Sequence, residues 1–247
     1  MVIREVNETK DENIIECIES FKNNGFINYF GLQRFGNSIE APTHQIGKLL
    51  IQNKIKEAIE MILRPRKSSY EKSEIKKARE VWETSNHDAN RALVYLDRVN
   101  CLEKYLLNGL SQSDKNDYLG AFQFIPRNMR LMYLHAYQSY VWNEAASERI
   151  KIFGLKPCVG DLVIKKGNNR GVVKSEEKEA IILNENNLNE YDIYDVVLPL
   201  PGHDVKYPNN NCRNILFVFY SINNLQFNFY YLISKRVLWK FASKRWN

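Results

Sequence analysis

The residues best suited to chemistry lie in one short segment, residues 25–36, which reads GFINYFGLQRFG. Four aromatic side chains are interleaved there with amides and a guanidinium, and three glycines let a ligand approach the backbone closely. Such rings stack on nucleobases, while amides and guanidinium groups bind base edges and phosphates. Such a set can form a nucleic-acid site, but aromatic residues between glycines more often form a packed corner of a protein core, and composition does not decide between the two.

Arginines outside this segment are candidates for contacts with phosphates, because they flank proline or asparagine at expected helix ends. They are Arg64, Arg66, Arg127 and Arg130. Another basic stretch, residues 72–79 (KSEIKKAR), has lysines four residues apart with Glu80 nearby. That spacing favours an ordinary solvated helix face over a binding site.

Metal and cofactor chemistry find no support in the sequence. The histidines share no metal-ligand spacing, and His135, on the longest expected helix, is interpreted as a buried or capping side chain. No phosphate-binding loop and no GxGxxG motif occurs, so we expect no nucleotide cofactor. The four cysteines are widely spaced without a CxxC pair, which favours buried, reduced thiols over a disulfide or a zinc site.

The elements that must position these residues form a helix-rich chain with a β portion near its end. Apolar residues at helical spacing predict helices, and short β-branched runs between Gly and Asn predict strands. The expected strands cover residues 1–6, 161–165, 170–174, 180–183 and 196–198, and the expected helices cover 12–23, 45–63, 71–82, 88–96, 102–110, 115–124 and 127–153. This segregation of helices and strands predicts an α+β fold.

The net charge of +6 is distributed unevenly over the 247 residues. Residues 1–202 hold 28 basic and 28 acidic side chains, so the whole excess lies in residues 203–247. This tail has no Glu and resembles translated non-coding sequence, but two strands over 215–222 and 225–233 are the other interpretation. Its basic residues, which alternate with aromatic residues over 234–246, would also suit binding to RNA or to a membrane surface.

Composition excludes several classes of protein. With 44% hydrophobic and 26% charged residues the chain is neither disordered nor fibrous. No apolar run before the tail is long enough to cross a membrane, and the charged first residues are unlike a secretory signal. We expect a protein that is not secreted and has no membrane partner.

Residues 28–36, NYFGLQRFG, resemble the NxFGxQRFG signature of the TruD family of RNA pseudouridine synthases. The similarity extends over about residues 2–208 and is closest to the eukaryotic branch. Further matching motifs are APTHQIG at 41–47, ILRPR at 62–66, IPRN at 125–128, RLMYLH at 130–135, YQSYVWN at 137–143, GLKP at 154–157 and LPLPG at 198–202. The resemblance implies an isomerase that converts uridine in RNA to pseudouridine without a cofactor or a metal.

The same resemblance implies roles for individual residues. Phe30 matches the phenylalanine that stacks on the flipped uracil, and Asn28 matches the asparagine that hydrogen-bonds near the catalytic aspartate. Gln33 and Arg34 match the QR pair, which is expected to hold the loop or the RNA backbone. The implied partner is tRNA, with messenger or small nuclear RNA as further substrates, bound by a monomer in the nucleus, the cytoplasm or both.

Two family motifs do not occur in the sequence, the one that contains the catalytic aspartate and an upstream lysine motif that accompanies it. The catalytic aspartate belongs to a GxKDxxAxTxQ motif upstream of NxFG, and Asp11 lacks that context, so it is interpreted as a solvated acid at a helix start. The resemblance divides the chain into part of a mixed-sheet catalytic domain (1–55), a helix-rich TRUD insertion domain with a small β portion (56–202) and a divergent basic and aromatic tail (203–247). We therefore expect the chain to be inactive alone, with a non-catalytic RNA-binding module or a non-functional truncated product as alternatives.

Overall fold

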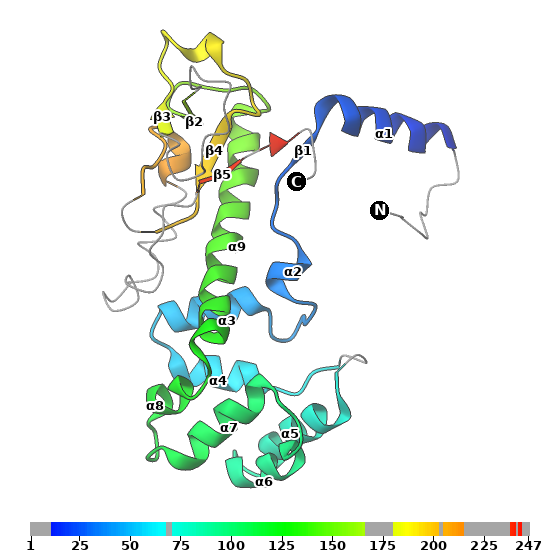
Figure 1. Cartoon of the computed structure of the whole chain (residues 1–247), viewed down its shortest axis with the longest axis vertical. Helices are drawn as coiled ribbons and strands as arrows, with labels where there is room; N and C mark the ends of the chain where they lie inside the picture. The colour runs from blue at the N-terminus through cyan, green and yellow to red at the C-terminus, as the bar shows by residue number, and fades with distance from the viewer. Residues whose placement is uncertain are drawn as a thin grey trace.

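The computed structural model describes residues 11–67, 71–165, 180–202, 205–214, 238–240 and 242–243. The strands predicted over residues 1–6, 170–174, 215–222 and 225–233 lie outside the described residues. Figure 1 shows that one long helix, α9 (Arg127–Phe153), follows the long axis of the molecule. Short helices gather at one end of α9 and a small sheet lies at the other.

The bounds of α9 are those that the sequence predicts. Pro126, which has no amide proton to leave unpaired, stands at its N-cap. At the other end Gly154 adopts a φ of 69°, and its amide donates to the carbonyl of Ile150 (2.9 Å), a left-handed ending that favours glycine. Tyr137 of α9 belongs to the helical core, whereas Trp142 belongs to a second core beside the sheet. The helix therefore joins two hydrophobic cores.

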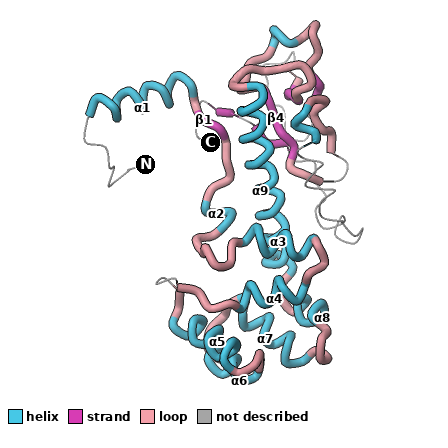
Figure 2. Tube along the Cα trace, turned by 180° about the vertical axis from the view of Figure 1, so that it is seen from behind, coloured by secondary structure: helices cyan, strands magenta, loops and turns pink. Residues whose placement is uncertain are grey.

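The helical core is built from short helices around the N-terminal half of α9 (Figure 2). They are α3 (Thr43–Ile51), α4 (Ile55–Leu63), α5 (Ser73–Thr84), α6 (Ala89–Leu93) followed by a 3-10 turn (Val94–Leu96), α7 (Leu102–Gln112) and α8 (Tyr118–Gln123). Gly47 allows α3 to approach α9 closely, because a Cβ atom there would lie 2.1 Å from the carbonyl oxygen of Tyr133. From α5 onward these helices confirm the predicted ones, with small shifts at their ends.

The prediction of one helix over residues 45–63 is wrong, because the chain turns between α3 and α4. Asn53 takes a left-handed φ of 58° in this turn, a conformation that asparagine tolerates better than most residues. Leu50 before the turn and Ile55 after it are both buried in the same core. The apolar period therefore continues across the break, and periodicity alone could not reveal it.

The sheet is antiparallel and has the order β3-β2-β4-β5. Its strands are β2 (Leu162–Ile164), β3 (Ala180–Ile182), β4 (Val196–Pro199) and β5 (Leu238–Lys240). A separate pair joins β1 (Phe26–Ile27) to β6 (Ala242–Ser243), also antiparallel. Backbone of the predicted tail thus pairs with both sheets, an arrangement that its composition did not predict. Helices combined with these small sheets confirm the α+β class.

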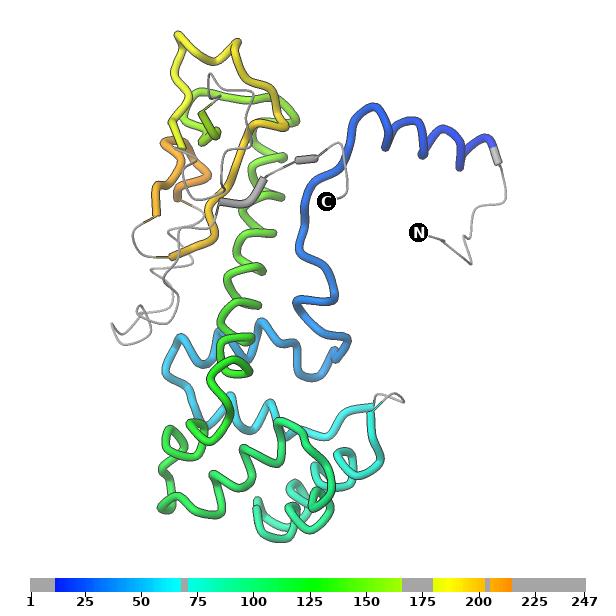
Figure 3. The backbone as a smooth tube through the Cα atoms, viewed as in Figure 1, coloured from blue at the N-terminus to red at the C-terminus, as the bar shows by residue number. Residues whose placement is uncertain are grey.

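The remaining elements lie before the helical core or beside the sheet. They are α1 (Asp11–Asn24), α2 (Leu32–Phe35) and a 3-10 turn at Leu188–Glu190. Figure 3 shows that α1 extends away from the other described elements, and Ile15 and Ile18 on it stay exposed. In contrast, β1 and α2 run alongside α9 in Figures 1 and 2, which brings the chemistry-bearing segment onto the long helix.

The cysteines differ in their surroundings, and none forms a disulfide. Cys212 is buried, as predicted, Cys101 and Cys158 are half-buried, and Cys17 is exposed, against the prediction. Burial raises the pKa of Cys101 to about 11 and that of Cys158 to about 12, so both thiols are protonated at neutral pH. Within the described ranges, no helix has both the length and the hydropathy of a membrane span.

Candidate functional site

The NYFGLQRFG segment is fastened to α9 through Phe30 and Tyr29. The amide of Phe30 donates to Oδ1 of Asn143 (2.9 Å), and Nδ2 of the same asparagine donates to the carbonyl of Phe30 (2.9 Å). The hydroxyl groups of Tyr29 and Ser147 share a hydrogen bond (3.0 Å) one helical turn further on. The segment thus follows the axis of α9 and is held by its backbone as well as by its side chains.

The Phe30 ring lies between a second ring and a guanidinium group. Trp142 meets it edge to face, with ring centroids 5.6 Å apart and an interplanar angle of 86°. Arg34, on α2, places its Cζ atom 5.6 Å from the centroid of the Phe30 ring. These are the preferred geometries of an aromatic pair and of a cation above a ring. Phe30 is half-buried and Arg34 exposed, so the cluster belongs to both a core edge and the surface.

Asn28 sits at a tight turn directly before this cluster. The amide of Tyr29 donates to the carbonyl of Ile27 (2.8 Å), so Asn28 is the central residue of a three-residue turn. Its side chain is half-buried. The turn ends β1 and redirects the chain toward Phe30, which places the amide of Asn28 and the ring of Phe30 at adjacent points of one loop.

A second ring stack supports the far end of the segment. Phe35 meets His44 edge to face (5.4 Å between centroids), and His44 stacks on Tyr140 of α9 at 4.5 Å and 7°. Desolvation lowers the pKa of His44, and its Nδ1 atom is buried without a hydrogen-bond partner in the described residues. The sequence suggested no role for His44, although the APTHQIG motif that contains it was a usable signal.

The other members of the predicted set are distributed more widely. Gln33 is exposed on α2, and the structure gives it no part in holding Phe30. Arg64 and Arg127 are exposed at the ends of α4 and α9. Asn143, which binds the Phe30 backbone, lies 16 positions after Arg127 on α9. At a rise of about 1.5 Å per residue, these two residues are about 24 Å apart along the helix. The structure therefore does not bring Arg127 together with Phe30.

Arg66 and Arg130 are less exposed than Arg64 and Arg127. Both are half-buried, and their Nε atoms lack a hydrogen-bond partner in the described part of the chain. Desolvation and the charge of Arg79 lower the pKa of Arg66. Arg66 also donates to the carbonyl of Ile62 (3.4 Å). Arg66 and Arg130 stay candidates for phosphate contacts, with less exposed side chains than Arg64 and Arg127.

Two interpretations of charged side chains need correction. His135 is neither buried nor a cap but exposed on α9, and desolvation together with the charge of Arg34 lowers its pKa. In the 72–79 stretch Arg79 is buried and forms ion pairs with Glu71 and Glu103, so this residue is not solvated. An arginine with two carboxylate partners can be buried, and charge spacing along one helix does not reveal partners on other segments.

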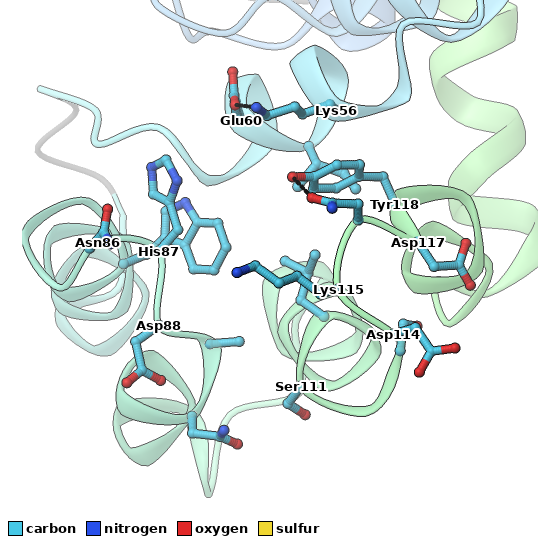
Figure 4. A pocket seen from close by; sticks show the side chains of 17 residues that line it. Lys56, Glu60, Asn86, His87, Asp88, Ser111, Asp114, Lys115, Asp117 and Tyr118 are labelled. Carbon is cyan, nitrogen blue, oxygen red and sulfur yellow. Dashed lines mark hydrogen bonds and ion pairs between the residues drawn. The ribbon is translucent and has the colours of Figure 1, made fainter.

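A hollow of about 440 Å³ lies among helices α4 to α8 (Figure 4), and Phe30 is not one of the residues that line it. His87 stacks on Trp82 at its edge (4.8 Å), and Lys115 points into it. The charged residues around it are Lys56, Lys115, Glu60, Asp88, Asp114 and Asp117. Because acids outnumber lysines, the lining does not favour a phosphate group. The Phe30 cluster therefore remains the candidate site.

The described residues thus combine an α+β fold with an aromatic cluster that is bound to its longest helix. Residues 1–237 match the sequence profile described as "tRNA pseudouridine synthase D (TruD)". The chain therefore belongs to the TruD family of pseudouridine synthases. The match passes residue 208, where the similarity of individual motifs was expected to end, and includes most of the predicted tail.

Individual relatives give the same result. The chain is 43% identical over 213 residues to the human Pseudouridylate synthase 7 homolog, with 86% of this chain and 30% of the human protein covered. It is 42% identical over 233 residues to Multisubstrate pseudouridine synthase 7 of Schizosaccharomyces pombe, covering 87% of this chain and 34% of that protein. The chain thus spans about a third of the length of these curated relatives.

A solved structure confirms the fold. The crystal structure described as "Putative tRNA pseudouridine synthase D (TruD)" from Methanosarcina mazei superposes with a TM-score of 0.74 at 22% identity. The superposition covers 97% of this chain and 57% of that one.

Proposed function

We propose that this chain supplies the uridine-binding part of an RNA pseudouridine synthase, which isomerises uridine to pseudouridine in tRNA and also accepts messenger or small nuclear RNA. The observation that carries the proposal is the Phe30 ring, which is fixed by its own backbone to α9 and lies beside Trp142 and Arg34. Membership of the family supplies the reaction class.

A fixed ring serves this reaction because the target base must leave its stack before its glycosidic bond can be cleaved. Unstacking costs a few kcal/mol, and stacking on an aromatic side chain returns about 1–3 kcal/mol per base. A platform that is already rigid loses little conformational entropy when the base arrives. Phe30 meets this requirement, and Asn28 at the adjacent turn can bond the edge of the base or the nucleophile beside it.

The proposal assigns base binding to this chain and leaves bond cleavage to a nucleophile that the 247 residues do not provide in the family's motif. Asp11 begins α1, and α1 extends away from α2 and α9 in Figure 1. This arrangement supports the interpretation of Asp11 as an acid at a helix start rather than as the nucleophile. We infer that the chain alone binds uridine in RNA without converting it.

Phosphate contacts complete the proposed complex with RNA. Because residues 1–202 are neutral overall, attraction to RNA must come from individual exposed arginines rather than from net charge. Arg34 beside the platform and Arg64 and Arg127 at helix ends are exposed in the required way. We place the protein, as a monomer, in the nucleus, the cytoplasm or both, where such RNA is present.

The decisive experiment compares binding with turnover. The full chain is incubated with a uridine-containing tRNA, pseudouridine is mapped, and the affinity is measured for the same RNA and for one with the target uridine made abasic. We expect a preference for the uridine RNA and no pseudouridine. Turnover would show that the nucleophile lies within these residues, and equal affinities would contradict the proposed uridine site.

A further inference from the structure

We infer that Asn143 is a positioning residue for the reaction, which fixes the Phe30 ring by binding both polar groups of the Phe30 backbone. This inference rests on the proposed function, because it concerns the ring that is proposed to stack on uracil. Its structural basis is one carboxamide that accepts from the amide of Phe30 and donates to its carbonyl, each at 2.9 Å.

Two hydrogen bonds from one planar group restrict the position and the orientation of the Phe30 backbone together. A single bond would let the Phe30 peptide pivot around it, whereas a matched donor and acceptor fix its distance, its direction along α9 and its rotation. The pattern is that of a residue paired with a neighbouring strand, with the carboxamide taking the place of the strand's backbone. β1 ends at Ile27, three residues before Phe30. Asn143 thus binds the backbone of the segment beyond the end of this strand, at the residue that carries the ring.

The helix face that carries Asn143 makes the clamp rigid. Trp142, the preceding residue, is fully buried, touches the Phe30 ring and donates from Nε1 to the carbonyl of Leu198 on β4 (3.1 Å). Asn143 itself is half-buried at the interface. Consecutive residues of α9 thus hold the backbone and the ring of Phe30, and α9 is anchored to the sheet behind them. Backbone held in this way gives the ring a fixed position for a base to stack on.

Other side chains cannot take over this function without loss. Aspartate keeps an acceptor for the Phe30 amide but presents a carboxylate oxygen to the Phe30 carbonyl, so half of the clamp becomes repulsive. Leucine has a similar volume and removes both bonds. Ser147→Ala is the matched control, because it removes the bond to Tyr29 from the same helix one turn away and leaves Phe30 untouched.

The first test detects the Asn143–Phe30 hydrogen bonds, which we call the Phe30 clamp, in the absence of RNA. Amide hydrogen exchange of the full chain is followed for wild type, Asn143→Leu, Asn143→Asp and Ser147→Ala, with the amides of α9 as the check that each variant is folded. We expect the Phe30 amide to be protected in wild type, in Asn143→Asp and in Ser147→Ala, and to exchange rapidly in Asn143→Leu. An unprotected Phe30 amide in wild type, or a protected one in Asn143→Leu, overturns the inference.

The second test measures whether the Phe30 clamp is needed for uridine binding. Affinity is measured for a short single-stranded RNA with one uridine and for the same RNA with that base removed. We expect Asn143→Leu to lose most of an approximately tenfold uridine preference, Asn143→Asp to lose part of it, and Ser147→Ala to retain it. Wild-type preference in Asn143→Leu overturns the positioning role. Absence of preference in wild type contradicts the proposed function instead, and the exchange measurement then decides on the clamp.

Discussion

Arg149 and Asp161 form a fully buried ion pair, with Nη2 and Oδ2 2.6 Å apart, that joins the last turns of α9 to the start of β2. The guanidinium also donates to the carbonyls of Gly154 (3.0 Å) and Lys156 (2.7 Å), and Asp161 accepts from the amide of Cys158 (3.0 Å). The pair therefore fixes the turn after α9 and keeps the helix that carries the Phe30 clamp in place against the sheet.

Asp161→Asn should destabilise the protein severely, because it leaves the Arg149 charge buried without a counterion. Removing one partner of a buried pair costs about 3–5 kcal/mol. The free energy of unfolding is measured in urea. Glu148→Gln is the control, since Glu148 pairs with Lys151 on the exposed side of α9 and its loss should leave stability unchanged. An Asp161→Asn variant as stable as wild type would show that the pair carries no net stability.

The sequence predicts those features whose cause is local. The period of α9, Pro126 before it and Gly154 after it predict that helix to the residue, and the NxFGxQRFG motif singles out Asn28 and Phe30. Contacts between distant segments escape such reasoning. The bonds between Phe30 and Asn143 join residues 113 positions apart, and no spacing rule relates them.

The same distinction explains the wrong predictions. Arg79 was expected on a solvated face because spacing of three or four residues along a helix reveals neither Glu103, which lies on α7, nor Glu71, eight residues before Arg79. The break between α3 and α4 was missed because both helices bury their apolar faces in one core. A local pattern records which face of a helix is buried, but it does not record where the chain turns or which charged residue meets which.

Gly47→Ala should destabilise the contact between α3 and α9. Its Cβ would lie 2.1 Å from the carbonyl oxygen of Tyr133, so the helices must move apart, and overpacking of this kind costs about 1–3 kcal/mol despite the better helix propensity of alanine. Gly31→Ala is the matched control, because nothing lies within 4 Å of its Cβ position and its φ of −103° suits alanine. Thermal unfolding distinguishes the two. Equal melting temperatures would mean that α3 and α9 adjust freely.

His44 should make stability depend on pH. Desolvation lowers its pKa in the folded chain, so the unfolded chain binds the proton more readily. Its contribution to stability is complete above the unfolded pKa of about 6.5 and is lost as pH falls through the lower folded value. His44→Phe keeps a ring between Phe35 and Tyr140 but cannot titrate. We expect urea unfolding at several pH values to show a shallower decline below pH 6.5 in this variant, and an unchanged decline would assign the effect to other groups such as His135.

Arg127→Ala should reduce the salt dependence of RNA binding. Each phosphate contact contributes about 0.7–0.9 to the slope of log affinity against log salt concentration, so loss of one contact lowers the slope by about that amount. Lys77→Ala is the control, because Lys77 is exposed but pairs with Glu80 (3.8 Å) on α5. Titrations of tRNA at several salt concentrations compare them. Identical slopes in wild type and Arg127→Ala would exclude this arginine from the RNA contact.

Phe30→Leu should abolish recognition of uridine while leaving general RNA binding intact. Leucine keeps the backbone bonds to Asn143 and some packing against Trp142, but it offers no planar face, so about 1–3 kcal/mol of stacking per base is lost. Phe35→Leu is the matched control, since it makes the same change in the same segment at a ring that packs on His44. The measured quantity is the ratio of affinities for a uridine RNA and its abasic counterpart. We expect this ratio to approach one in Phe30→Leu and to stay at the wild-type value in Phe35→Leu. If both variants retain it, the base is bound elsewhere, and if both lose it, the segment as a whole rather than the Phe30 ring determines recognition.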